Sequence, residues 1–244
     1  MRSFALFATG AMLLTQVLVA QPGWQYTYTG NKYSTATGPY TTNMRFTLGF
    51  RTSAPIPKNF KGIFDIRKTA TNVIGGDGVS GFPGSSFAAF EISETNADGT
   101  PVSWSAAIDS FFDLCPSTSF VQGSSGSGGE SVIRRNCFTF QSIGAAASPT
   151  GGVWTITPPT PATLTAYLLT LVTQMDIQQQ GQSLTQQLLA ILTDINNTTL
   201  GLACSDLTAF ANHVAAQTDK KITTPQVAEI QTWVGYIRSG IPCP

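Results

Sequence analysis

The hydrophobic period of this chain changes at a proline-rich segment, Thr157–Pro161, which reads TPPTP. Before this segment apolar and polar residues alternate, as they do around Met44, Phe46, Leu48 and Phe50, and this is the pattern of a half-buried strand. After it, apolar residues recur about every 3.6 positions, the period of an amphipathic helix. Three prolines in four positions form a stiff, extended connector. The chain is therefore expected to fold as two units, β first and α second.

We expect an antiparallel β-sandwich domain over residues 21–156, a Pro-rich linker over 157–162 and a helical bundle over 163–244. Seven or so short strands separated by turn signals are typical of a sandwich. The clearest hairpin turns at Asn96–Gly99. Residues 69–86 are rich in Gly, Asn and Ser and are expected to be loops, as is Gly123–Gly129. The expected strands lie near residues 24–28, 44–50, 60–66, 88–92, 102–108, 133–140 and 153–156.

Four amphipathic helices with short connections predict a small four-helix bundle in the second unit. Ser183 with Gln186 forms a capping-box pattern and predicts the start of the second helix. Thr224 before Pro225 predicts the start of the fourth. The apolar stripes are centred on Leu164 to Met175, Leu184 to Ile195, Ala203 to Val214 and Ile230 to Ile237.

Residues 1–20 have the three parts of a secretory signal peptide. Arg2 supplies the positive end, Phe4–Val19 is an apolar run, and Leu18–Ala20 fits the pattern of a cleavage site. The alternative is a retained N-terminal anchor. We expect a secreted or cell-surface protein with no membrane contact after cleavage.

Charge is sparse and balanced, with 13 basic and 13 acidic residues that together make up 11% of the chain. No basic field is present that would hold nucleic acid or an anionic membrane. Nucleic acid is therefore excluded as an expected partner, while the oligomeric state stays open.

Four cysteines in an exported chain indicate two disulfides. Three connectivities are open, and pairing within each half is favoured, which joins Cys115 to Cys137 and Cys204 to Cys243. The second bridge fits a bundle in which the third and fourth helices are antiparallel neighbours. No Cys-x-x-Cys occurs, so we expect no zinc site and no cofactor.

No catalytic set is expected. His213 is the single histidine, lies in the helical half and is interpreted as a packing or helix-surface residue. Two carboxylate pairs are candidates for glycoside or ester hydrolysis. The first pair is Glu91 with Glu94, which are three positions apart and so face opposite sides of a strand. The second pair is Asp109 with Asp113, which follow the end of a strand.

Three acidic residues in glycine-rich loops, Asp77, Asp98 and Asp113, are candidate calcium ligands. Their spacing does not match a calcium-binding loop, and Asp98–Gly99 is explained as a hairpin turn, so no metal site is expected.

Aromatic residues are the best candidates for ligand binding. Trp24, Tyr26 and Tyr28 alternate along one strand and are expected to point into the core. Tyr33 and Tyr40 lie in predicted loops, so we expect them to be exposed and able to stack on a sugar.

The segment Tyr26–Phe50 resembles the opening of β-sandwich modules in bacterial exported proteins of the PEP-CTERM type. Asp77–Val79, Phe90–Ile92, Asn96–Gly99 and Val102–Trp104 follow in the order that such modules show. The chain has no PEP motif and no Arg-rich tail, so the resemblance does not imply covalent sorting to the envelope.

The last eighty residues resemble a helical accessory module at the C-termini of exported bacterial proteins. The residues that carry this resemblance are Ala203–Cys204, Leu207–Val214, Lys220–Thr223 and Cys243. The absence of a catalytic set, together with both resemblances, favours a non-catalytic exported protein that interacts with the cell surface, the extracellular matrix or a glycan. Two alternatives remain: a polysaccharide or ester hydrolase that uses rim carboxylates, and a purely structural envelope or biofilm component.

Overall fold

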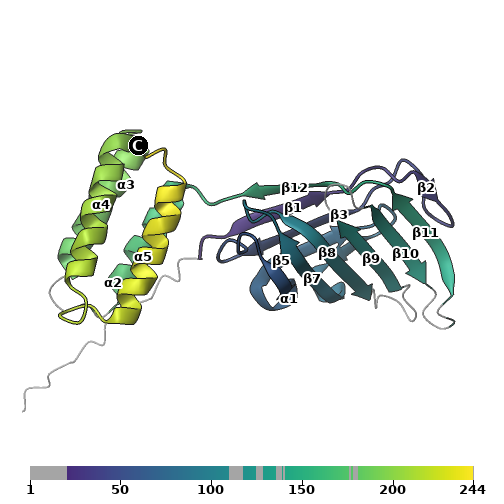
Figure 1. The fold of residues 1–244 in the computed structure, drawn as a ribbon, viewed down its shortest axis with the longest axis horizontal. Coiled ribbons are helices and arrows are strands. Elements are labelled where there is room, and N and C mark those ends of the chain that lie inside the picture. Colours follow the sequence, from purple (N-terminus) through teal and green to yellow (C-terminus); the bar gives the residue numbers. More distant parts are fainter. Residues whose placement is uncertain are drawn as a thin grey trace, which may run out of the picture.

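The computed structural model describes residues 21–109, 118–124, 129–135, 139, 141–175, 177 and 181–243. An N-terminal antiparallel β region is followed by C-terminal helices, which are grouped at one end of the molecule (Figure 1). The expected signal peptide, Cys115, Cys137 and Asp113 lie outside the described residues.

The first sheet has five antiparallel strands in the order β12-β1-β3-β5-β6. β1 begins with the alternating aromatic residues and pairs with β3 on one side and β12 on the other. The strands are β1 (Trp24–Thr29), β3 (Thr47–Thr52), β5 (Ala70–Gly76), β6 (Gly81–Pro83) and β12 (Val153–Thr157).

The second sheet has seven antiparallel strands in the order β2-β11-β10-β9-β8-β7-β4. The expected hairpin is β7–β8, and the Asn96 side chain closes its turn by accepting from the N–H groups of Asp98 and Thr100. The strands are β2 (Thr35–Ala36), β4 (Lys61–Asp65), β7 (Phe87–Thr95), β8 (Pro101–Asp109), β9 (Thr118–Ser124), β10 (Glu130–Arg135) and β11 (Ser142–Ser148).

Aromatic side chains from both sheets meet in one core. The Tyr26 ring stacks on Phe50 at a centroid distance of 4.9 Å, and Phe50 contacts Phe90 of the other sheet edge-on at 5.4 Å. Tyr28 similarly contacts Trp104 at 4.8 Å. The expectation that the β1 rings point into the core is confirmed. Such rings supply much of the buried apolar area of a domain.

The expected loop at residues 69–86 is wrong, because it contains β5, β6 and a short 3-10 helix, Gly84–Ser86. β11 was also missed. These strands are rich in Gly, Ala and Ser, so they have little apolar alternation. Their backbones pair with apolar neighbouring strands instead, which local sequence does not report.

The four C-terminal helices pack as neighbours in the pairs α2–α3, α3–α4, α4–α5 and α2–α5. The proline-rich segment separates the two parts of the chain, since β12 ends at Thr157 and α2 begins at Pro161. The helices are α2 (Pro161–Gln174), α3 (Gly181–Asn196), α4 (Leu200–Ala216) and α5 (Thr224–Ser239); α1 (Ile66–Thr69) is a single turn in the β region.

One predicted helix start needs correction and another is confirmed. α3 begins at Gly181, so Ser183 is inside the helix and is not its cap. α5 begins at Thr224 as predicted; its N-cap is Thr223, whose N–H donates to the Gln226 side chain. None of the helices in the described part of the chain is long and apolar enough to span a membrane.

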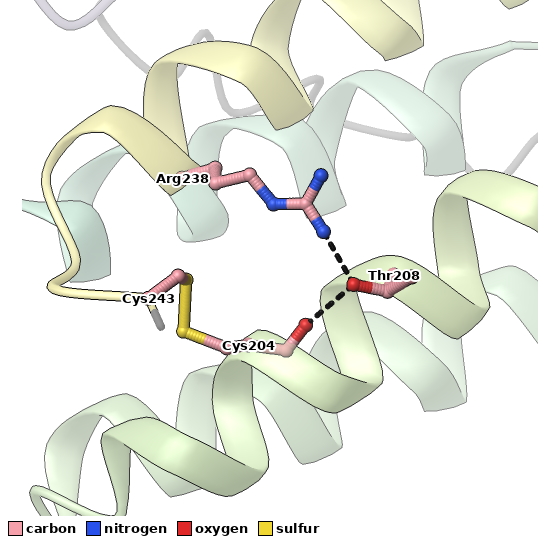
Figure 2. Close-up of a disulfide and its surroundings, with 4 residues drawn as sticks. All are labelled: Cys204, Thr208, Arg238 and Cys243. Carbon is pink, nitrogen blue, oxygen red and sulfur yellow. Dashed lines mark hydrogen bonds between the residues drawn. A yellow bond between two sulfur atoms is a disulfide. The ribbon is translucent and has the colours of Figure 1, made fainter.

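The Cys204–Cys243 disulfide is present and joins α4 to the segment after α5 (Figure 2). Beside it, the Arg238 guanidinium donates to the Thr208 hydroxyl, which itself donates to the Cys204 carbonyl oxygen. The chain end is therefore held to α4 by a covalent bond and by a short hydrogen-bond relay.

Candidate functional site

Tyr33 and Tyr40 are buried, so the expectation that they are exposed is wrong. Only 2% of Tyr33 and 4% of Tyr40 is accessible to solvent. Both hydroxyls donate to Asp77: Tyr33 to its carbonyl oxygen at 2.9 Å and Tyr40 to Oδ2 at 2.7 Å. The short β2 pairing with β11 draws this segment against the second sheet. In this conformation neither ring is open for stacking on a sugar.

Asp77 organises the turn between β5 and β6. Its carboxylate is fully buried and accepts from the N–H groups of Val79 and Ser80. Burial raises the pKa of the Tyr33 hydroxyl, and the charge of Asp77 adds to this effect. The two tyrosines therefore act as positioning residues that hold the Asp77 turn in place.

The three acidic residues considered for calcium do not come together. Asp77 is buried in its turn, and Asp98 is exposed in the β7–β8 turn. Among the residues with described positions, no group of three His, Cys, Asp or Glu side chains is placed to hold a metal ion.

A second buried carboxylate, Glu130, was not anticipated. It lies at the start of β10, with 2% of its surface accessible, and its Oε2 accepts from the Tyr28 hydroxyl at 2.7 Å. The same hydroxyl accepts from the Gly152 N–H at 2.6 Å. Tyr28 thereby joins both sheets, since it belongs to β1 and Glu130 to β10. A Cβ at Gly30 would lie 2.6 Å from Glu130 Oε2, so the carboxylate packs directly against that glycine backbone.

Burial has the largest effect on the pKa of Glu130. Desolvation raises the pKa of Glu130, although the Tyr28 hydroxyl, the Asn31 N–H and the charge of Arg45 each act to lower it. Burial likewise raises the pKa of Tyr28, and the hydrogen bond and charge of Glu130 raise it further.

A surface groove of about 520 Å³ lies over the Asp77 turn. One wall is the chain before β3, and the other is the β5–β6 turn. Arg134 of β10 reaches this turn and donates to Ser80 Oγ at 2.5 Å. The groove is lined by Asn43, Met44, Arg45, Thr47, Gly76, Gly78, Val79, Ser80 and Gly81.

The outer face of the first sheet carries an array of exposed threonines, which we call the threonine face. Thr27 pairs with Thr155 across β1 and β12, and Thr29 pairs with Thr47 across β1 and β3. Thr47 also lines the groove, so face and groove are continuous. The exposed residues of the threonine face are Thr27, Thr29, Thr47, Thr155 and Thr157.

In the described residues the strand register separates the backbones of Glu91 and Asp109, two of the residues considered for hydrolysis. Glu91 pairs with Ser105, four positions before Asp109 on β8, so their backbones are roughly 13 Å apart. Glu94 forms an exposed ion pair with Lys61 at 3.5 Å.

His213 lies on α4, where its Nδ1 is 2.8 Å from Gln187 Nε2 of α3. This contact between neighbouring helices agrees with its interpretation as a packing residue.

Two features of the site were missed from the sequence although a signal for each is present. Glu130 alternates with the apolar Val132, which would place it on the inner face of its strand. Thr27-Tyr-Thr29 and Thr155-Ile-Thr157 each place two hydroxyls on one face. Comparisons with protein-family models, with curated proteins and with solved structures found no match to this chain.

Proposed function

We propose that this chain is an exported, non-catalytic binding protein, built as a β-sandwich and a disulfide-tied four-helix bundle. Its partner is a surface glycan or another polysaccharide of the cell envelope. The observation that carries the proposal is the threonine face, which leads without a break into the groove at Thr47.

The chemistry of the threonine face suits a neutral polysaccharide. Its residues are spaced about 4.8 Å across strands and about 6.8 Å along them, which is a regular, flat array. Each threonine offers a hydroxyl that donates and accepts, together with a methyl group for the apolar face of a sugar ring. At the groove end, Asn43 and Arg45 add polar groups that orient a ligand.

Export is supported by two features of the chain. Residues 1–20 have the pattern of a secretory signal. The Cys204–Cys243 bridge is of a kind that persists in oxidising compartments. Binding is favoured over hydrolysis because the backbone of Glu91 is far from that of Asp109, and Glu94 is paired with Lys61.

The test is retention of the chain from residue 21 on insoluble β-glucan, chitin and peptidoglycan. Replacing the paired Thr27 and Thr155 by valine keeps the β propensity and removes two hydroxyls. We expect the double variant to bind about tenfold more weakly, or about 1.4 kcal/mol. Thr232→Val, on the exposed side of α5, is the matched control and should bind as the unmodified chain does.

Equal binding by the double variant and the unmodified chain would remove the threonine face as the site. Release of soluble sugars from any of the polymers would favour the hydrolase alternative. Absence of binding to all of them would favour a purely structural role.

A further inference from the structure

Three unpartnered polar atoms gather in the core around Tyr28. Among the described residues, the indole Nε1 atoms of Trp104 and Trp154 and the Oε1 atom of Glu130 are buried without a hydrogen-bond partner. The Tyr28 ring centre lies 4.8 Å from that of Trp104 and 5.0 Å from that of Trp154. Its hydroxyl binds the other Glu130 oxygen. The three side chains that carry these atoms therefore all contact Tyr28.

The strand register places Trp104 and Glu130 in one row of the second sheet. Trp104 pairs with Gly123 of β9, and Ser131, the residue after Glu130, pairs with Gln122. Continuing that antiparallel register places Glu130 beside Gly123. Trp104 and Glu130 thus lie in one row on either side of a glycine, with backbones roughly 10 Å apart. A glycine contributes no side chain to the space between an indole and a carboxyl group.

Leaving these atoms without partners is costly. A buried donor or acceptor without a hydrogen bond keeps its full desolvation penalty, and the penalty is larger if the group is charged. Folded proteins satisfy such groups with internal water, which typically makes about three hydrogen bonds. Two N–H donors and one carboxylate acceptor match the two lone pairs and one hydrogen of a single water molecule.

We propose that this site binds one internal water molecule, which accepts from the indole N–H groups of Trp104 and Trp154 and donates to Glu130 Oε1. The water hydrates the buried carboxylate on the side that Tyr28 does not reach. This proposal is independent of glycan binding, because the water site lies between the sheets and away from the threonine face.

The other titratable or charged groups that act on Glu130 are on the side of the first sheet. They are the hydroxyl of Tyr28 on β1 and the guanidinium of Arg45 before β3, together with the N–H of Asn31. Tyr33 is coupled electrostatically to the same carboxylate. The proposed water supplies a hydrogen bond to Oε1, the carboxylate oxygen that the Tyr28 hydroxyl does not bind.

The first experiment uses the unmodified chain and NMR of its four tryptophan indole groups. The Hε1 protons of Trp104 and Trp154 should show cross-peaks to a water molecule with a long residence time. A crystal structure should place that water within hydrogen-bond distance of both nitrogens and of Glu130 Oε1. Indole protons without such cross-peaks, or a protein atom at the water position, would overturn the proposal.

The second experiment replaces Trp104 by phenylalanine, which keeps an aromatic ring and removes one donor to the water. We expect the titration midpoint of Glu130 to shift upward, because the ionised form loses hydration. Trp24→Phe is the control, since Trp24 contacts Tyr236 at the end of β1 remote from Glu130. An unchanged midpoint in a folded Trp104→Phe variant contradicts the proposal, and the first experiment decides if that variant does not fold.

Discussion

The β region and the helical region are stabilised in different ways. In the β region, Tyr28 connects residues far apart in the chain: Glu130 is 102 positions away and Gly152 is 124. In the helical region, hydrogen bonds are mostly local. Thr165 and Thr170, for example, each donate to a carbonyl four residues earlier. The one covalent link there is the disulfide between Cys204 and Cys243.

Because of this difference, the stability of each region depends on a different solution condition. The β region contains a buried carboxylate whose pKa is raised by burial, so its stability depends on pH. The helical region has an apolar interior and a bridge, so its stability depends on redox conditions instead. The ring contact between Trp24 of β1 and Tyr236 of α5, at 5.0 Å, connects the two regions.

The largest effect is expected from removing the bridge by the double substitution Cys204→Ser and Cys243→Ser. The two cysteines are 39 positions apart, and closing a loop of that size is worth about 4 kcal/mol in the chain-entropy estimate. The backbone amides of α4 and α5 should lose protection from hydrogen exchange, while those of the β7–β8 hairpin should keep it. Hydrogen exchange followed peptide by peptide measures this.

The unmodified chain treated with a reductant is the control, and it should lose protection in the same helical peptides. If the β7–β8 peptides lose protection equally, the two regions unfold as one unit and the comparison fails.

The next largest effect is expected from Tyr28→Phe, which acts on the β region. The substitution removes the hydroxyl that serves both Glu130 and Gly152, and so leaves a buried carboxylate with one donor fewer. We expect a loss of about 2–3 kcal/mol in the free energy of unfolding at neutral pH. Denaturant titration followed by tryptophan fluorescence measures it.

Tyr236→Phe is the matched control because it removes a tyrosine hydroxyl from the helical region and keeps the ring against Trp24. Its effect should stay below about 0.5 kcal/mol. A loss of the same size in both variants would contradict a special role for the Tyr28 hydroxyl.

The sequence predicted best the elements whose own residues determine them. The β7–β8 hairpin alternates strongly and has an Asn-x-x-Gly turn, and α2 has a clear apolar period, although it begins at Pro161, inside the segment expected to be the linker. β5 and β11 were missed because ATNVIGG and SIGAAAS show no alternation of large apolar residues. Such strands form by pairing with neighbours.

The candidate site was predicted less well because its contacts are long-range. Tyr33 and Tyr40 lie outside the strands, as predicted, but their hydroxyls bind Asp77 and the rings are buried. Asp77 is 44 residues from Tyr33 and 37 residues from Tyr40. No local pattern shows that a loop tyrosine will find such a partner. The threonine face was readable only after the order of β12, β1 and β3 was known.

At neutral pH, Glu130→Gln is expected to change the free energy of unfolding least. Its pH dependence nevertheless gives the sharpest distinction between the two regions. Because burial raises the pKa of Glu130 in the folded state, the folded protein binds this proton more tightly than the unfolded chain does. The stabilising contribution is therefore fully present below the unfolded pKa and is lost as pH rises through the folded value. The unmodified chain should gain stability relative to Glu130→Gln as pH falls.

Asp65→Asn tests a pH dependence of stability with the opposite sign, in the same β region. Desolvation acts to raise the pKa of Asp65, but hydrogen bonds from Arg67 and Lys68 and the Arg67 charge lower it overall. Its contribution is present at neutral pH and is lost as pH falls. Unfolding measured between pH 7 and pH 3 should thus show opposite trends for the two substitutions in the β peptides and no trend in α4. A parallel trend for both, or one centred on α4, would show that pH acts on net charge and not on the Glu130 site.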